Sequence, residues 1–170
     1  MTRPARNGCG GGAAEAAQVS VNTPVTVGAN SSVVLPWEHF QTTNQDVFST
    51  QPGPNVAGDT TLQVDRAGAV FVASAVEWEA GAPFNAVANL FMGQFGWIDF
   101  LHGEWAGVVG STGTIDGSAN WMIDFRMGAV QAGYNCPVIA INLDAAPHDV
   151  NVAFINILWW PLTNAPATVY

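Results

Sequence analysis

The chain has 170 residues and a formal net charge of −9, and 49% of its residues are hydrophobic while only 10% are charged. Its four basic residues are all arginines, too few and too scattered to bind the phosphates of a nucleic acid or a membrane surface. The apolar fraction and the seven tryptophans exclude intrinsic disorder, and no apolar run is long enough to span a bilayer.

The low share of charged residues bears on the surface of the protein. A soluble monomer covers its surface with charge, and this chain has little of it. We therefore expect much of the surface to be buried against other protein subunits. The alternative is a monomer whose surface is made of Ser, Thr, Asn and Gln.

The N-terminal segment, residues 1–18, is predicted to be a flexible arm. It contains Arg3, Arg6 and a glycine run at 10–12, followed by small residues that offer one weak helical turn at 15–18. No apolar segment follows the arginines, so we expect no signal peptide. An arm of this kind orders when it binds a neighbour.

Most of the chain shows short alternations of apolar and polar residues, which are typical of strands. Strands are expected at 19–27, 32–37, 60–64, 69–78, 86–92, 97–101, 104–109, 121–129, 137–143 and 150–160. The polar stretches 41–58, 93–96 and 111–118 are expected to be turns or loops. The pattern predicts one all-β domain over residues 19–162, with a short tail at 163–170.

Several of these segments, taken in order, resemble a known family. The strand at 60–64 leads to Ala67 and Gly68 and then to a long strand that ends at Trp78, and the sequence Gln-Ala-Gly-Tyr at 131–134 precedes another strand. This order resembles the jelly rolls of the tumour-necrosis-factor and complement-globular-domain family, and phage structural proteins carry a similar pattern. The resemblance covers about residues 19–162. The family often has aspartate at the position of Tyr134 and lacks such an arm.

The resemblance implies an antiparallel jelly-roll β-sandwich that assembles as a homotrimer, with aromatic residues of one sheet packed around a threefold axis. It also implies a closing strand at 150–158 with Phe154 and Ile157 facing inward. Trp159 and Trp160 are neighbours on that strand and must point to opposite faces. One of the two tryptophans is therefore expected to face solvent or a partner.

The histidines offer no strong catalytic or metal site. His39, His102 and His148 are far apart in sequence, and His102 with Asp99 and Glu104 is the best local set. We interpret that set as a surface hydrogen-bonding group and expect no enzyme activity and no cofactor.

The remaining polar candidates are equally weak. Glu77 and Glu79 share a strand face but show no sugar-binding cleft, and Asp144 and Asp149 lack the spacing of a calcium loop. The two cysteines, Cys9 and Cys136, are expected to be unpaired thiols.

The function that fits best is structural. We predict a virion protein of a tailed bacteriophage, a trimeric capsid decoration or minor capsid protein. Its partners are expected to be copies of itself and the major capsid protein or other virion subunits. Arg3, Arg6, Trp159 and Trp160 are predicted to lie at assembly interfaces.

Other functions remain open. The first is a tail or fibre protein that binds host-surface carbohydrate through Trp97 and Trp105, which flank a turn. The second is an enzyme that uses His102, and the third is a secreted ligand.

Overall fold

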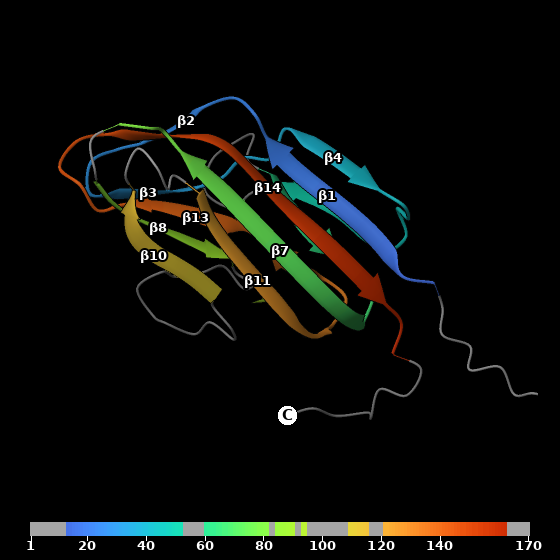
Figure 1. The fold of residues 1–170 in the computed structure, drawn as a ribbon. Helices are drawn as coiled ribbons and strands as arrows, with labels where there is room; N and C mark the ends of the chain where they lie inside the picture. Colours follow the sequence, from blue (N-terminus) through green and yellow to red (C-terminus); the bar gives the residue numbers. More distant parts are fainter. Residues whose placement is uncertain are drawn as a thin grey trace, which may run out of the picture.

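The computed structural model describes residues 13–52, 60–81, 84–90, 93–94, 109–115 and 121–162. Within these ranges the regular elements are all β-strands, so no described helix is available to cross a membrane. The strands form two layers, a broad sheet and, behind it in Figure 1, two smaller ones. The expected all-β sandwich is confirmed.

The large sheet has the strand order β11-β7-β14-β1-β4, and β2 also pairs with β14. Its neighbouring strands are all antiparallel. The members are β1 (Glu15–Val21), β2 (Val25–Val27), β4 (His39–Thr42), β7 (Gly68–Trp78), β11 (Trp121–Val130) and β14 (His148–Trp160). The long strand β14 therefore lies in the middle, between β1 and β7.

The second layer is made of two four-stranded sheets. One has the order β10-β8-β13-β3 and consists of β3 (Ser31–Val34), β8 (Phe84–Leu90), β10 (Val109–Ile115) and β13 (Val138–Asn142). The other has the order β5-β6-β12-β9 and consists of β5 (Phe48–Pro52), β6 (Thr60–Val64), β9 (Gly93–Gln94) and β12 (Tyr134–Cys136). Only Pro137 separates β12 from β13, and its missing N–H interrupts the ladder there.

The core lies between the layers and draws side chains from all three sheets. Alternate residues of each strand point inward, as Val70, Val72 and Val76 do on β7. The largest fully buried side chains of this cluster are Trp78, Phe48, Leu35, Leu62, Leu90, Ile155 and Ile157. Burying each of them contributes about 1.5–3 kcal/mol, which holds the two layers together.

Residues 15–18, which were expected to belong to the arm, are part of a strand. The weak helical turn expected at 15–18 is wrong, because β1 begins at Glu15 and pairs with β14 from Glu15↔Trp159 to Val21↔Ala153. Pairing with strands on both sides supplies hydrogen bonds that the short local sequence does not reveal.

Two polar stretches also contain strands that the sequence did not suggest. The expected loop at 111–118 is wrong in its first half, because β10 pairs with β8 over its whole length. The stretch 41–58 contains the end of β4 and all of β5. The expected turn at 93–96 begins with the short strand β9, which pairs with β12. The strand expected at 97–101 lies outside the described residues, and so do residues 104–108 of the strand expected at 104–109, whose last residue begins β10.

Two details of the family resemblance have different outcomes. The turn before Tyr134 is present, and Gly133 in it has φ of +85°, a conformation that suits glycine. Ile157 faces the core as expected, whereas the inward placement of Phe154 is wrong. Phe154 is paired with Ala75 on the outer side of the sheet, since residues three apart on a regular strand cannot share a face.

Candidate assembly surface

The outer face of the large sheet carries exposed apolar side chains. On β11, Trp121, Ile123, Phe125 and Met127 point away from the core and are 43–67% exposed. They follow one another at every second position, as the pleat of a strand requires. An edge strand that exposes four large apolar residues is unusual for a free soluble subunit.

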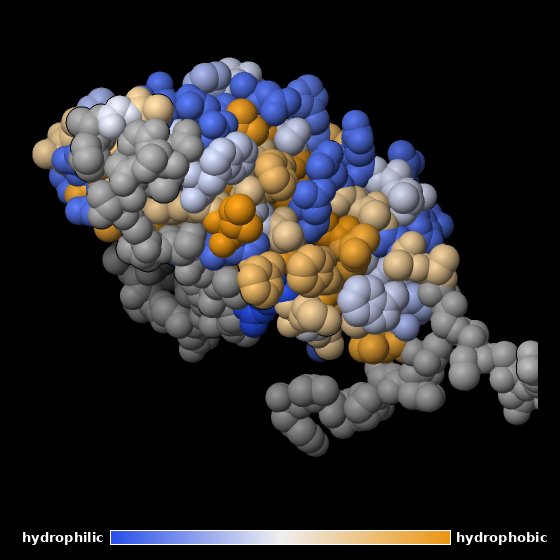
Figure 2. Space-filling view, viewed as in Figure 1, coloured by the Kyte–Doolittle hydropathy of each residue, from blue (hydrophilic) through white to orange (hydrophobic). Residues whose placement is uncertain are grey.

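The neighbouring strands continue this apolar surface. Met127 lies opposite Phe71 of β7, which in turn lies opposite Leu158 of β14. The rings of Phe71 and Phe125 are stacked with centroids 6.4 Å apart, and Trp121 contacts Phe154 with centroids 6.2 Å apart. We call this surface the apolar face; it consists of Phe71, Trp121, Ile123, Phe125, Met127, Phe154, Leu158 and Trp160. Figure 2 shows apolar side chains gathered over these strands.

Charge is nearly absent from the apolar face. Among the described outward residues of β7, β11 and the part of β14 paired with β7, only Glu77 is charged, and it lies opposite Trp121 at one end. The chain as a whole carries a net charge of −9. The carboxylates are therefore concentrated elsewhere, and this face is the part of the described surface best suited to contact another protein.

Strand β11 places its polar residues on the inner side. Asp124 is only 7% exposed, and Arg126 on the same side is half-buried, with its Nη1 atom buried. The four outward residues are apolar, whereas these two are charged. Sequence reasoning missed the apolar face, although the alternation at 121–127 contains the signal for it.

The outer face is polar at its other edge, over β1 and β4. Gln18 donates a hydrogen bond from Nε2 to Asn156 Oδ1 at 2.7 Å. At the start of β1, Thr43 Oγ1 donates to Glu15 Oε2 at 2.7 Å, and Glu15 itself lies on the inner side of the sheet, opposite Trp159. The hydrogen bonds from Thr43 and Asn44 lower the pKa of Glu15. A shallow open depression of about 400 Å³ lies here, lined by Ala16, Ala17, Gln18, Gln41, Thr42, Thr43, Asn156, Ile157 and Leu158.

The tryptophan pair expected at an interface divides between the two sides of β14. Trp159 is 6% exposed and packs in the core, where its indole N–H donates to the carbonyl of Arg66 at 3.2 Å. Little of Trp159 is left to contact a neighbour. Trp160 lies on the outer side, half-buried, at the end of the apolar face.

Other residues singled out in the sequence lie outside the described part of the chain. These are Arg3, Arg6, Cys9, Trp97, Asp99, His102, Glu104 and Trp105. Cys136 is described: it is buried as a free thiol, and burial raises its pKa to about 12.

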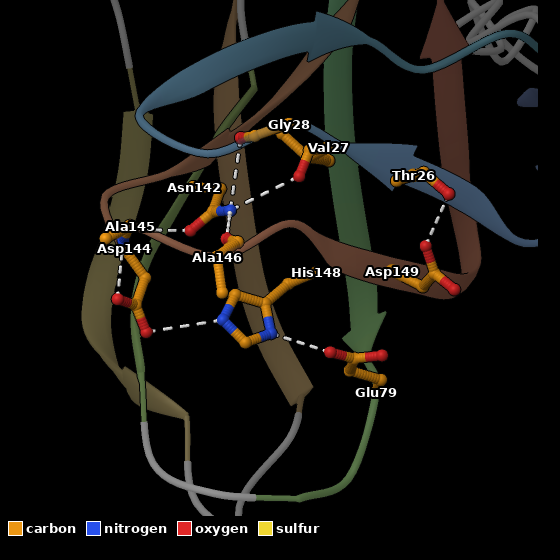
Figure 3. Close-up of polar contacts among 10 residues, drawn as sticks. All are labelled: Thr26, Val27, Gly28, Glu79, Asn142, Asp144, Ala145, Ala146, His148 and Asp149. Atoms are coloured by element: carbon orange, nitrogen blue, oxygen red, sulfur yellow. Dashed lines mark hydrogen bonds and ion pairs between the residues drawn. The ribbon is translucent and has the colours of Figure 1, made fainter.

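The carboxylates considered for calcium or sugar chemistry have structural partners. Glu79 and Asp144 both contact His148, and Asp149 accepts a hydrogen bond from Thr26 Oγ1 at 2.6 Å (Figure 3). No cluster of His, Cys, Asp and Glu suited to a metal ion occurs among the described residues.

Comparison with known proteins identifies the fold. No family model matches the chain, and no curated protein matches its sequence. Among solved structures, PRD1 vertex protein P5 aligns with a TM-score of 0.54 at 10% sequence identity, over 88% of this chain and 73% of that chain. The two facing layers of antiparallel strands agree with this likeness.

This chain is a jelly roll. A second solved structure, Eiger TNF from S. frugiperda, aligns with a TM-score of 0.49 at 15% identity, over 91% of this chain and 98% of that chain. The likeness to PRD1 vertex protein P5 and the antiparallel sheets confirm the jelly-roll class expected from the sequence.

Proposed function

We propose that this jelly roll is a structural protein of a bacteriophage virion and that it assembles as a homotrimer through the apolar face. The observation that carries the proposal is the exposed and nearly uncharged outer side of β7, β11 and β14. The likeness of the fold to PRD1 vertex protein P5 supports the virion role.

Electrostatics favours a second copy of the chain on this face. Two copies that each carry a net charge of −9 repel one another, and the repulsion is smallest where they meet through surfaces without charge. The apolar face has only Glu77 at one end among its described residues, and none of the residues that line the depression over β1 and β4 is charged, so identical copies approach through these surfaces at the lowest cost.

The shape of the outer face favours a cyclic arrangement. Phe125 and Met127 project from the edge strand β11, each 67% exposed, whereas the depression lies at the opposite edge, over β1 and β4. In a closed ring each subunit presents two different patches, and the first patch of one subunit contacts the second patch of the next subunit. We therefore place β11 of one subunit against the depression of its neighbour, with Trp160 near the contact.

The proposed attachment to the shell involves the arm. Arg3 and Arg6 are two of only four basic residues in an acidic chain, and they are suited to pair with acidic groups of another virion protein. Because β1 begins at Glu15, removing residues 1–12 leaves every described strand intact. The truncated protein should keep its far-ultraviolet circular dichroism spectrum and bind more weakly to phage particles stripped of it. Unchanged cosedimentation with those particles would contradict the role of the arm.

Light scattering after size-exclusion chromatography tests the assembly. The wild type should have about three times the chain mass of 17.9 kDa, and Phe125→Ser combined with Met127→Ser should give a folded monomer. Leu143→Ser is the matched control, because Leu143 is 50% exposed but belongs to the β13–β14 connection. A wild-type monomer at micromolar concentration, or a trimer that survives the double substitution, would contradict the proposed interface.

A disulfide trap tests which surfaces meet. Phe125 and Gln41 belong to one row of paired residues, with Ala73, Asn156 and Gln18 between them. Four strand spacings put their Cα atoms about 19 Å apart within one subunit, far beyond the reach of a disulfide.

Phe125→Cys with Gln41→Cys, in a Cys9→Ser background, should therefore form covalent oligomers on oxidation, because the link is possible only between subunits. Cys136 is buried and does not interfere. Each single substitution is the control, and a double variant that stays monomeric in a denaturing gel would contradict the proposed arrangement.

A further inference from the structure

The first residue of β14, His148, lies between two carboxylates from different parts of the fold. Its Nδ1 atom is 2.6 Å from Glu79 Oε1, and its Nε2 atom is 3.3 Å from Asp144 Oδ2 (Figure 3). Glu79 directly follows β7, and Asp144 belongs to the connection between β13 and β14. One imidazole ring thus joins two connections at the same end of the sandwich.

The ring of His148 is held in place by the core. It stacks on Phe84 of β8 with centroids 3.6 Å apart and planes 5° apart, and Phe84 in turn packs edge-on against the fully buried Trp78. The side chain of His148 is 13% exposed, compared with 37% for Glu79 and 38% for Asp144. Because the ring is packed from one side, its two nitrogen atoms stay directed at the two carboxylates.

The chemistry of imidazole makes this arrangement depend on one proton. A carboxylate only accepts hydrogen bonds, and a neutral imidazole has a single N–H to donate. The charged ring has two N–H groups and satisfies both carboxylates at once. Loss of a proton leaves a lone pair facing one carboxylate, and the longer contact, to Asp144, is the one we expect to open.

The surroundings contain no other described cation that neutralises these carboxylates. Glu79 and Asp144 face the ring from β7 and from the β13–β14 connection. The third nearby carboxylate, Asp149 on β14 itself, is bonded to Thr26 of β2. The ring contact from β8, Phe84, carries no titratable group. Of the two described arginines, Arg66 pairs with Asp46 elsewhere in the fold, and Arg126 lies on β11 opposite Val72.

A second set of bonds limits the effect to this end of the molecule. The side chain of Asn142 donates to the carbonyls of Val27, Gly28 and Ala146, and none of these groups titrates near neutral pH. The base of the β13–β14 connection therefore stays anchored when His148 loses its proton. Local opening rather than unfolding is expected.

We propose that His148 is a pH-responsive clamp, closed when its ring is charged, that ties the β7–β8 and β13–β14 connections together. The clamp does not depend on the proposed assembly function. It places a conformational response to pH at one end of the sandwich.

Amide hydrogen exchange of residues 143–146 tests the clamp. The ratio of exchange rates between His148→Phe and the wild type should be roughly tenfold at about pH 5.5 and near one at about pH 8.5. Phenylalanine keeps the stacking on Phe84 and removes both donors. Taking the ratio at each pH cancels the intrinsic pH dependence of exchange.

Two further variants make the result specific. Asp144→Asn should reproduce the faster exchange of its own segment at low pH, and His39→Gln, on the exposed strand β4, should match the wild type at both values. If His148→Phe folds poorly, Glu79→Gln supplies the same comparison, because it removes one of the two charges that hold the ring. Equal ratios at the two pH values, or an equal effect of His39→Gln, would overturn the proposal.

Discussion

Asn142 ties four backbone groups together from a site without solvent access, and its loss should be costly. Its exposed fraction is 0%, and its Nδ2 atom lies 3.2, 3.1 and 2.6 Å from the carbonyl oxygens of Val27, Gly28 and Ala146. Its Oδ1 atom accepts from the backbone N–H of Asp144 at 2.8 Å. Asn142→Ala therefore removes two donor hydrogens and one acceptor.

At about 1 kcal/mol for each lost bond, the expected decrease in the free energy of unfolding is about 3 kcal/mol. Asn142→Asp is a sharper variant. It places a carboxylate against three carbonyl oxygens and should destabilise more than alanine does.

Urea unfolding followed by tryptophan fluorescence measures both effects, at one protein concentration because assembly adds to the apparent stability. The denaturation midpoint should fall while the slope of the transition stays the same. Asn22→Ala, at an exposed position, is the control and should change stability by less than about 0.5 kcal/mol. A loss below about 1 kcal/mol for Asn142→Ala, or an Asp variant as stable as the wild type, would refute the reasoning.

Three further predictions concern other parts of the fold. Gly68→Ala should lower the melting temperature, with a cost of about 1–3 kcal/mol, because the new Cβ would overlap the indole of Trp159, whereas Gly128→Ala meets nothing within 4 Å and should be neutral. Cys136 should resist thiol alkylation at about pH 8 in the folded protein and react in urea, because burial raises its pKa to about 12. Mass spectrometry of the peptide that contains Cys136 measures the labelling, and labelling of the folded protein would contradict the prediction. Hydrogen bonds from Thr23 and Asn22 lower the pKa of Glu38, so its stabilising effect is present above the ordinary glutamate pKa and is lost as the pH falls through the lowered value. Glu38→Gln should therefore reduce the fall of the melting temperature at acid pH. Parallel plots of melting temperature against pH for the variant and the wild type would contradict this role.

The strands with regular alternation were predictable from the sequence. Strands β6, β7, β13 and β14 were expected close to their observed positions, since each has apolar residues at the inward sites. Strand β10 was missed because its sequence, Val-Gly-Ser-Thr-Gly-Thr-Ile, is small and polar. It forms a strand because it pairs with β8, and the local sequence does not report such lateral pairing.

The position of the apolar face could not be predicted from the sequence. An apolar stripe on a strand normally marks the side that faces the core, and Asp124 with Arg126 would normally mark the solvent side. In β11 the apolar residues face solvent and the charged ones face inward: Ile123 and Phe125 are exposed, and Asp124 is buried. The sequence alone predicted that much of the surface contacts other subunits, but the identity of the sheet that carries the apolar residues required the register of β11 against β7.

The central place of β14 has a consequence for synthesis of the protein. This strand lies between β1 and β7, and its pairs join Glu15 with Trp159 across nearly the whole sequence. While the ribosome is still making the chain, β1 and β7 have no partner between them, and the large sheet cannot close until Trp160 has emerged. Folding should therefore follow translation and be slow, as for other topologies dominated by contacts distant in sequence. Until then the nascent chain depends on chaperones or on low local concentration to keep its apolar strands from aggregating.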